Sequence, residues 1–354
     1  MLKEISIGVV GAGNIAKYNH LPAYKKVKGV RVAAICDIDI EKAKRLAEEF
    51  GIEKYYGSMD EMIKCEDIDA VDICTWNREH VPLSLKAVRL GKHVMCEKPA
   101  AVSLEELKQL KIELEKTGLV YLLAVPNRFK SETIYLKSLA DRNFFGDICY
   151  AKANYLRRRG APVGWFSDKS ISGGGPIMDI GVHAIDSAWY LLGSPRPIRV
   201  CASLSYAIGK TDVYGKEPYI AAPSPNGKYD CEDTGAGVID FENGTQLFFE
   251  ASWTLNLPDR RETFIGGSKA GAMLTPPTLY TDLDGVAVTE NLDIDTVDPF
   301  AGEIEHFCEC VRSSNTNTRY NIDQAIVMQT ILQAIYRSDE LKRQVEIDKD
   351  GNIL

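Results

Sequence analysis

The chain lacks any apolar run near the roughly 20 residues that a membrane-spanning helix requires. It also lacks an excess of positive charge, because 42 Lys and Arg stand against 50 Asp and Glu, a formal net charge of -8. Such a balance argues against nucleic acid and anionic membranes as partners. The first apolar stretch is only as long as a strand and is interrupted by Ser6 and Gly8, so no signal peptide is expected. We expect a cytoplasmic protein.

Disulfide frameworks and metal-ligand clusters are also missing from the sequence pattern. The nine cysteines are scattered and odd in number, which is typical of reduced thiols. Cys308 and Cys310 are close, but on a predicted helix the single residue between them turns their side chains apart. None of the five histidines pairs with a cysteine at ligand spacing. We therefore expect no metal site.

The clearest motif that is present lies at the amino terminus. Residues 5–10 form an apolar, β-prone run, and Gly11-Ala12-Gly13-Asn14-Ile15-Ala16 follows at once, ahead of a helix-compatible segment. This is the Gly-x-Gly-x-x-Gly/Ala dinucleotide fingerprint in its context of strand, turn and helix. The first glycine permits the sharp turn, the second lets the backbone approach a pyrophosphate, and the first N–H groups of the helix face the phosphates.

A second apolar strand over residues 30–36 ends at Asp37, about twenty residues beyond the fingerprint, where a ribose-binding acid belongs. A carboxylate at this place accepts hydrogen bonds from both ribose hydroxyls and repels a 2′-phosphate. The expected cofactor is therefore NAD rather than NADP. The alternative is a glycine turn in some other α/β protein.

Two further strands end in polar residues. Residues 70–74 form a buried-type strand before Thr75-Trp76-Asn77, and residues 94–96 form a short apolar strand before Glu97-Lys98-Pro99. Ligands of open parallel sheets bind beyond the carboxyl ends of the strands, so we expect Lys98 at the nicotinamide end of the crevice. The alternative for Lys98 is a solvated surface lysine.

A carboxylate and an imidazole stand four residues apart within residues 173–183, just after a glycine-rich loop. If the segment after Pro176 is helical, Asp179 and His183 lie on one face a turn apart, and the aspartate can set the orientation and tautomer of the ring. Such a pair handles protons. The spacing by itself also fits a surface pair.

Taken together, these motifs resemble the Gfo/Idh/MocA oxidoreductases, which include glucose-fructose oxidoreductase and inositol 2-dehydrogenase. The resemblance covers nearly all 354 residues and rests on residues 11–16, 75–80, 97–99 and 173–183 followed by Asp186. Trp76 departs from the pattern, since relatives usually carry proline there. The resemblance implies that Lys98, Asp179 and His183 converge on the substrate as the catalytic residues. The expected cofactor-binding residues are Gly11, Gly13, Asn14, Ile15, Asp37, Thr75, Trp76, Asn77, His80, Glu97, Lys98 and Asn127.

The fold class expected is α/β in two domains. Alternating strands and helices predict a Rossmann domain with a doubly wound parallel sheet over residues 1–125, and a substrate-binding and oligomerisation α/β domain over residues 126–354. The second domain is expected to hold an open mixed, mainly antiparallel sheet with one helical face. The resemblance implies that the other face packs against a second subunit in a homodimer or homotetramer. The expected elements are helices over residues 131–142 and 323–343 and strands over 148–156, 200–206, 234–241, 246–253 and 263–266, with a long excursion over 212–229 as a lid or an oligomer contact.

Substrate recognition is expected around a run of arginines, residues 157–159, and Trp165. An aromatic face stacks on sugar C–H surfaces while arginine donates to hydroxyl oxygens; a solvated loop is the alternative. The expected substrate-binding residues are Lys98, Arg157, Arg158, Trp165, Asp179 and His183.

The expected reaction passes a hydride between the nicotinamide and a ring secondary alcohol of a sugar, of a glycoside at C3, or of an inositol. His183 takes the hydroxyl proton while Lys98 donates a hydrogen bond to the same oxygen, and the reverse assignment stays open. Two alternatives remain: an NAD-dependent redox-assisted glycoside hydrolase or lyase of the same superfamily, and a non-catalytic NAD-binding sensor. The presence of Lys98, Asp179 and His183 together favours an enzyme.

Overall fold

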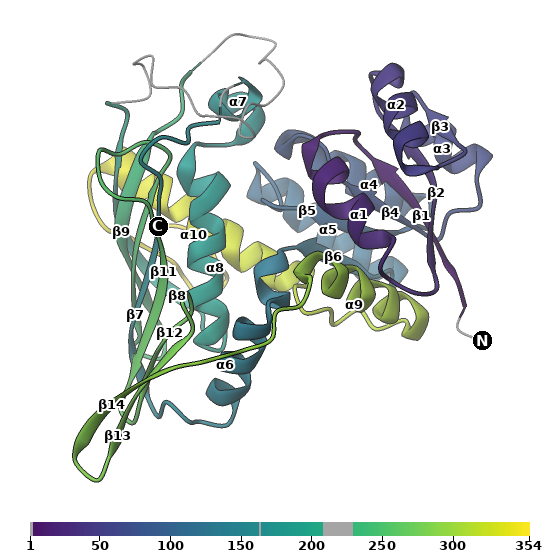
Figure 1. Ribbon diagram of the computed structural model, residues 1–354. Coiled ribbons are helices and arrows are strands. Elements are labelled where there is room, and N and C mark those ends of the chain that lie inside the picture. Colours follow the sequence, from purple (N-terminus) through teal and green to yellow (C-terminus); the bar gives the residue numbers. More distant parts are fainter. Residues whose placement is uncertain (1–2, 163, 208–228) are drawn as a thin grey trace. The chain divides into compact units, whose positions relative to one another are not determined.

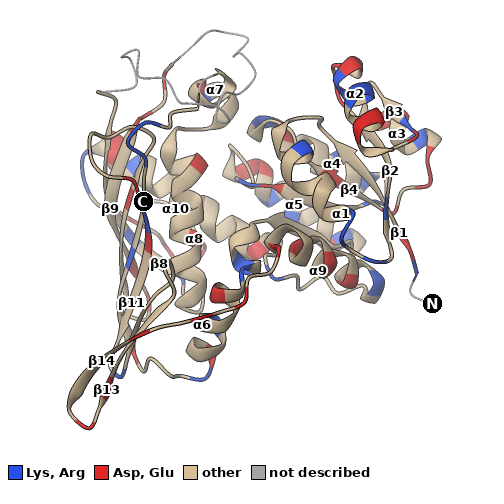
Figure 2. Ribbon diagram, viewed as in Figure 1, with Lys and Arg blue, Asp and Glu red and all other residues tan. Residues whose placement is uncertain are grey.

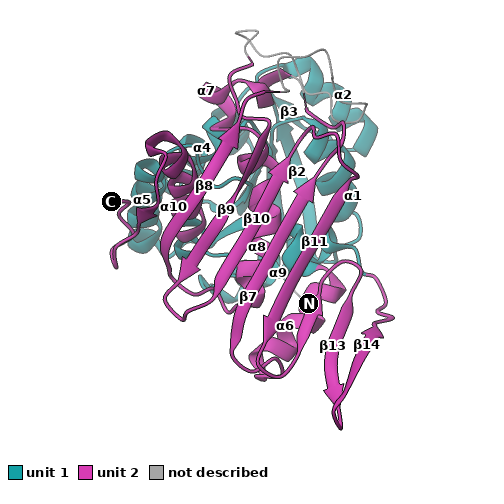
Figure 3. Ribbon diagram, turned by 90° about the vertical axis from the view of Figure 1, so that its left-hand side faces the viewer, with its two compact units in different colours: residues 1–129, 297–326 teal, residues 130–296, 327–354 magenta. Residues whose placement is uncertain are grey.

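The computed structural model describes residues 3–162, 164–207 and 229–354, which form two compact units (Figure 1). Unit 1 contains residues 1–129 and 297–326, and unit 2 contains residues 130–296 and 327–354 (Figure 3). The sequence predicted a single domain boundary, after residue 125. In the structure the chain leaves unit 1 after residue 129 and returns to it for residues 297–326. It returns because helix α9 (Pro299–Ser313) packs against α1 (Leu21–Tyr24) and the turn η3 (Pro126–Phe129). Most of the excursion expected over residues 212–229 lies outside the described residues.

Unit 1 is built on a six-stranded parallel sheet in the order β3-β2-β1-β4-β5-β6, which confirms the doubly wound arrangement. Its strands are β1 (Ile5–Val10), β2 (Val30–Cys36), β3 (Tyr55–Tyr56), β4 (Ala70–Ile73), β5 (His93–Glu97) and β6 (Tyr121–Ala124). Its other helices are η1 (Ala16–His20), α2 (Ile40–Phe50), α3 (Met59–Cys65), η2 (Asn77–Glu79), α4 (His80–Arg89) and α5 (Leu104–Thr117).

The strand ends of unit 1 are aligned. In the register of the sheet, Val10 of β1 pairs with Cys36 of β2 and with Ile73 of β4. Ile73 in turn pairs with Cys96 of β5. Because all these strands run in the same direction, the residues that follow them lie along one edge, here called the carboxyl edge. The expected cofactor-binding residues therefore come from neighbouring loops of a single sheet.

The helices of unit 1 begin where side chains can cap them. Asp39, Ser58 and Ser103 accept hydrogen bonds from backbone N–H groups three residues further on, at the starts of α2, α3 and α5. Helix α2 carries basic and acidic residues, Lys or Arg in blue and Asp or Glu in red (Figure 2). This is the amphipathic pattern of a helix that buries one face on a sheet.

Unit 2 contains a nine-stranded sheet in the order β14-β13-β12-β11-β7-β10-β9-β8-β15. Strands β7 and β10 are parallel and the other neighbours are antiparallel, which confirms a mixed, mainly antiparallel sheet. The strands are β7 (Ile148–Leu156), β8 (Pro197–Ser205), β9 (Thr234–Phe241), β10 (Gln246–Ser252), β11 (Arg260–Gly267), β12 (Gly271–Met273), β13 (Thr278–Leu283), β14 (Val286–Asn291) and β15 (Val345–Glu346). The last four strands were not expected from the sequence, because they are short or largely exposed and lack an apolar alternation.

Helices cover one face of the unit 2 sheet. These are α6 (Ser131–Asp141), α8 (Val182–Leu191) and the part of α10 (Ile322–Leu341) that belongs to this unit (Figure 1). The other face carries no helix among the described residues (Figure 3). No helix in the described ranges combines the length and apolar character needed to cross a membrane.

Candidate functional site

The loop after β1 has the geometry of a phosphate-binding turn. Gly11 has a φ of +104°, and a Cβ there would lie 2.5 Å from the carbonyl oxygen of Cys74, so no other residue fits. At Gly13, by contrast, the nearest atom to an added Cβ is the same oxygen at 3.9 Å. Gly13 and Asn14 are both exposed. The turn is therefore closed on the sheet side at Gly11 and open on the outer side at Gly13, which fits a bound pyrophosphate.

Asp37, directly after β2, is tied to this turn. One carboxylate oxygen accepts a hydrogen bond from the backbone N–H of Ala12 at 2.8 Å, and the other accepts from the N–H of Asp39 at 2.9 Å. The next residue, Ile38, is uncharged and 90% exposed, so it offers no cation to a 2′-phosphate. The turn and the acid together fit the phosphate and ribose groups of a dinucleotide.

His80 joins two loops of the carboxyl edge. Its ring is buried, with Nδ1 2.7 Å from the carbonyl oxygen of Pro99 and Nε2 3.2 Å from that of Thr75. Burial lowers the pKa of His80, whereas its contacts with the two carbonyl oxygens act to raise it. The ring thus braces the loop after β4, which carries Thr75, Trp76 and Asn77, against the loop after β5.

The end of β5 places Glu97 and Lys98 differently. Lys98 is half-buried at the carboxyl edge, whereas Glu97 is buried. One oxygen of Glu97 accepts the backbone N–H of Lys98 at 3.0 Å, and the other lies 3.0 Å from Nε2 of His20. Nδ1 of His20 lies 2.8 Å from a carboxylate oxygen of Asp72, on β4.

Neither His20 nor Asp72 was expected as a site residue. The available signal was Asp72 itself, because a carboxylate inside an apolar, buried strand needs a partner. Asn127, expected to bind the cofactor, lies buried in η3 after β6.

In unit 2, Asp179 and His183 lie at the junction of the π-helical turn η5 (Ile177–Gly181) and α8. They are the two residues between positions 174 and 189 that are not buried. One carboxylate oxygen of Asp179 accepts a hydrogen bond from the indole Nε1 of Trp253 at 2.9 Å. Trp253 follows β10 and is completely buried. Sequence reasoning missed this tryptophan, which holds the carboxylate next to the expected base.

The start of η5 is anchored by Glu232. One oxygen of its buried carboxyl accepts hydrogen bonds from the N–H groups of Gly175 at 2.9 Å and Ile177 at 3.2 Å, and from the hydroxyl of Tyr336 at 2.7 Å. A Cβ at Gly174 would lie 1.8 Å from that hydroxyl oxygen, and one at Gly175 would lie 2.1 Å from the carbonyl oxygen of Glu232. These two glycines of the loop are required by close packing.

The arginine loop lies beside Trp253. The N–H of Arg157 donates to the carbonyl oxygen of Ser252, and the N–H of Gly160 donates to that of Trp253, each at 2.9 Å. The Arg157 guanidinium donates to the carbonyl oxygen of Gly160 at 3.1 Å. The loop that carries Arg157 is thereby joined to the tryptophan that binds Asp179.

The other two residues expected to recognise substrate differ in setting. Arg158 is exposed, and its N–H donates to a carboxylate oxygen of Asp259. Trp165 is half-buried in η4 (Gly164–Ser167) and stacks on Phe166, with ring centroids 3.9 Å apart.

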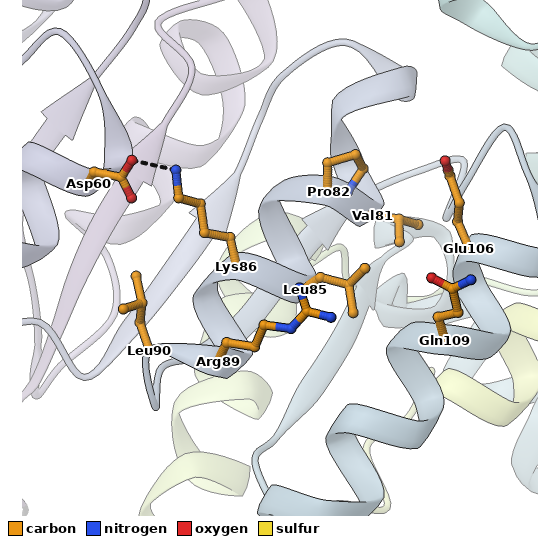
Figure 4. A pocket seen from close by; sticks show the side chains of 9 residues that line it. All are labelled: Asp60, Val81, Pro82, Leu85, Lys86, Arg89, Leu90, Glu106 and Gln109. Atoms are coloured by element: carbon orange, nitrogen blue, oxygen red, sulfur yellow. Dashed lines mark hydrogen bonds and ion pairs between the residues drawn. The ribbon is translucent and has the colours of Figure 1, made fainter.

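An open groove of about 530 Å³ runs along α4 in unit 1, beside α3 and α5 (Figure 4). Lys86 of α4 forms an ion pair with Asp60 of α3 at one side, and Glu106 and Gln109 of α5 lie at the other. None of the expected site residues lines it. The candidate residues therefore form two groups, one at the carboxyl edge of unit 1 and one at the η5–α8 junction of unit 2, and neither group lines this groove.

Comparison with known proteins assigns most of the chain to two family models. Residues 5–125 match an oxidoreductase family with an NAD-binding Rossmann fold, and residues 133–273 match the Gfo/Idh/MocA C-terminal domain. The chain belongs to the Gfo/Idh/MocA oxidoreductase family. The expected site residues lie within these two matched ranges, except Asn127, which lies between them.

Several relatives within the family match along almost their whole length. The D-glucoside 3-dehydrogenase of Escherichia coli K12 is 30% identical over 97% of this chain and 97% of its own. The scyllo-inositol 2-dehydrogenase (NAD(+)) of Bacillus subtilis 168 is 27% identical over 94% of each chain. A solved structure of levoglucosan dehydrogenase with NADH and levoglucosan has a TM-score of 0.85 at 22% identity, covering 98% of this chain and 100% of that one. The last of these shows the shared fold.

Proposed function

We propose that this oxidoreductase uses NAD to oxidise a ring secondary alcohol of a carbohydrate or polyol, with C3 of a glucoside as the preferred position. The observation that carries the proposal is the position of Lys98, directly after β5 on the same carboxyl edge as the glycine turn and Asp37. The preference for a glucoside is supported by the relative named D-glucoside 3-dehydrogenase, which matches 97% of this chain.

The chain's own residues have distinct roles in this proposal. The backbone of residues 11–15 holds the cofactor phosphates, and bound NAD supplies the hydride acceptor. Lys98 donates a hydrogen bond to the reacting oxygen and stabilises the negative charge that develops there. His183 accepts the hydroxyl proton, while Asp179, held by Trp253, orients it. In the reverse assignment, Lys98 is the base and His183 the donor.

We propose NAD rather than NADP as the cofactor. The support is the carboxylate of Asp37, which lies beside the glycine turn and accepts hydrogen bonds from backbone N–H groups on both its oxygens. The neighbouring Ile38 carries no charge. Repulsion between two negative groups at this position favours the unphosphorylated ribose.

The proposed substrate contacts come from Arg157, Arg158 and Trp165. Arg157 belongs to the loop bonded to Trp253, which supports a position near Asp179. A half-buried indole offers a flat apolar face to sugar C–H groups, and guanidinium groups donate to hydroxyl oxygens.

Hydride transfer from labelled substrate tests the proposal. Pyranosides that carry deuterium at single ring carbons are incubated with the enzyme and NAD, and the NADH is analysed by mass spectrometry. Label from C3 is the expected result. Label from C1 would instead indicate an aldose dehydrogenase that forms a lactone. Release of free aglycone without net NADH would indicate redox-assisted glycoside cleavage, and no transfer from any sugar or inositol would refute the substrate class.

We also propose that the helix-free face of the unit 2 sheet binds a second copy of the chain, in a homodimer or homotetramer. Tyr150 and Phe248 are 43% and 38% exposed on neighbouring strands of this sheet, with ring centroids 5.4 Å apart. Aromatic clusters of this kind are enriched in subunit interfaces. Phe248→Glu is expected to lower the molar mass measured by light scattering, to that of a monomer if the parent is a homodimer, and an unchanged mass would contradict the proposed interface.

A cytoplasmic location is proposed as well. All nine cysteines lie in the described part of the chain and none forms a disulfide there, which suits a reducing compartment. Fractionation of the cells that produce the protein tests this location.

A further inference from the structure

A histidine lies between two carboxylates in the interior of unit 1. His20, the last residue of the π-helical turn η1, is 1% exposed, and its ring nitrogens lie 2.8 Å from an oxygen of Asp72 and 3.0 Å from an oxygen of Glu97. Each carboxylate also accepts a hydrogen bond from a second donor. Asp72 accepts one from the hydroxyl of Tyr24 at 3.1 Å, and Glu97 accepts one from the backbone N–H of Lys98 at 3.0 Å. Both carboxylates therefore act as acceptors, and a ring that donates to both must carry two protons.

The charges around His20 favour this imidazolium. Burial by itself would lower the pKa of His20, but the adjacent Asp72 carboxylate raises it well above the usual range. Burial also acts to raise the pKa of Glu97, yet the hydrogen bond and charge of His20 lower it overall. Two negative groups thus flank one positive ring.

The remaining neighbours of His20 add no charge. Helix α9 contributes Phe300, whose ring centroid lies 5.9 Å from that of His20, and the buried Glu303. Burial, and then the charge of Glu97, raise the pKa of Glu303 well above its usual range, which favours its uncharged form. Burial raises the pKa of the Cys74 thiol to about 12, so it is neutral as well.

We propose that His20 is a charged positioning residue whose imidazolium holds the Glu97 carboxylate and, through it, the backbone N–H of Lys98. Glu97 ends β5 and Lys98 follows it, so the orientation of this carboxylate fixes the start of the loop that presents Lys98. A displacement of about 1 Å at a catalytic group is enough to slow a reaction strongly. The proposal deepens the proposed function and rests on Lys98 acting in it.

A bound metal ion is the competing use of this cluster. Nδ1 of His20, an oxygen of Asp72 and the sulfur of Cys74 lie within 4.8 Å of one another. A metal on Nδ1 would replace the proton that the imidazolium carries there. The protonation state of the two ring nitrogens therefore separates the two uses.

Nitrogen NMR of the unmodified enzyme tests the charge directly. In protein labelled with ¹⁵N-histidine, the His20 ring is expected to show two protonated nitrogens at pH 7, where an ordinary histidine is mostly neutral, since His20 is buried between carboxylates. The signal is assigned by replacing the other histidines one at a time. A neutral ring at pH 7, or zinc that remains bound to the purified protein in native mass spectrometry, would overturn the proposal. The other histidines are His80, His93, His183 and His306.

Kinetics test the link from His20 to Lys98. His20→Gln is expected to lower kcat by about tenfold or more while NAD affinity changes little. Glu97→Gln should give a similar loss, and the double variant should be no slower than the slower single variant, since both break one chain of contacts. The matched control is His93→Gln. His93 begins β5, the strand that Glu97 ends, and its replacement should retain the parent kcat.

The outcomes separate this proposal from the proposed function. Additive losses in the double variant, or a parent-like kcat in His20→Gln, would overturn the link even if the ring is charged. Full turnover by Lys98→Met would instead refute the role of Lys98 in the reaction and leave the NMR result standing. If His20→Gln does not fold, the NMR measurement still decides the charge, and Glu97→Gln still tests the contact with Lys98.

Discussion

Two buried glutamates, one in each unit, behave in opposite ways. Burial acts on both, but His20 and Lys98 provide positive charge beside Glu97, and its pKa is lowered. Glu232 accepts three hydrogen bonds, from Tyr336, Gly175 and Ile177, against two for Glu97, yet its donors are all neutral, and burial raises its pKa. The comparison teaches that a nearby cation, more than the number of hydrogen bonds, decides in which direction the pKa of a buried carboxyl shifts.

The largest expected effect comes from replacing Glu97 by glutamine, with Glu232→Gln as the comparison. At pH 7, Glu97→Gln is expected to reduce the free energy of unfolding by about 3 to 5 kcal/mol, because it breaks a buried ion pair and leaves His20 without one partner. Glu232→Gln should cost less than about 1 kcal/mol, because the amide oxygen still accepts the three hydrogen bonds. Urea unfolding of both variants measures the difference.

The pH dependence of stability sharpens the same comparison. The lowered pKa of Glu97 contributes stability that is present above its ordinary value of 4.5 and is lost as the pH falls through the folded pKa. The raised pKa of Glu232 contributes stability that is present below 4.5 and is lost as the pH rises through the folded pKa. As the pH rises above 4.5, the parent should therefore lose stability that the Glu232→Gln variant does not lose, so the difference in their free energies of unfolding should shift in favour of the variant. If the unfolding free energies of Glu97→Gln and Glu232→Gln changed with pH in the same way, the assigned directions of the two pKa shifts would be contradicted.

The second prediction asks whether both units supply chemistry. Lys98→Met in unit 1 and His183→Ala in unit 2 are each expected to lower turnover by at least about a hundredfold, the usual loss of an acid–base or electrostatic group. NAD affinity, measured by fluorescence titration, should change little. Near-parent turnover in either variant would remove that residue from the mechanism and leave catalysis to the other unit.

The third prediction separates glycines that face a ligand from glycines that face the protein. Gly175→Ala is expected to cost about 2 to 3 kcal/mol of stability, because its Cβ would meet a backbone carbonyl. Gly13→Ala should change stability by less than about 0.5 kcal/mol, since its surroundings are open, but should weaken NAD binding. Thermal unfolding and NAD titration of both variants are the measurements. Equal stability of the two would show that the loop around Gly175 adapts.

The smallest expected effect is on cofactor choice, which involves unit 1 alone. Asp37→Ser removes the carboxylate that repels a 2′-phosphate and should shift the preference from NAD toward NADP by about 1.5 kcal/mol, the value of one charge-assisted hydrogen bond. Ile38→Arg added to it should increase the shift. The ratio of kcat/KM for the two cofactors measures it, and a parent enzyme that prefers NADP would contradict the role of Asp37.

Local patterns were sufficient for much of this molecule. The apolar strands of unit 1 alternate with helices, and parallel strands place their following residues on one edge, so the shared edge of Gly11, Asp37 and Lys98 could be predicted from spacing. In unit 2 the same kind of pattern predicted β7 and β9 at their observed bounds. Strands β13 and β14 were not predicted, because most of their residues are exposed and do not alternate between apolar and polar.

The sequence by itself therefore determined the fold class, the dinucleotide turn and the helix that carries Asp179 and His183. Only the tertiary structure decided which buried groups stand behind them. His20 and Glu97 are 77 residues apart, and Asp179 and Trp253 are 74 residues apart. The return of α9 to unit 1 was likewise decided by packing. The physical reason is that periodicity reports burial and local geometry, whereas the partner of a buried polar group is chosen by whichever distant strand or helix packs against it.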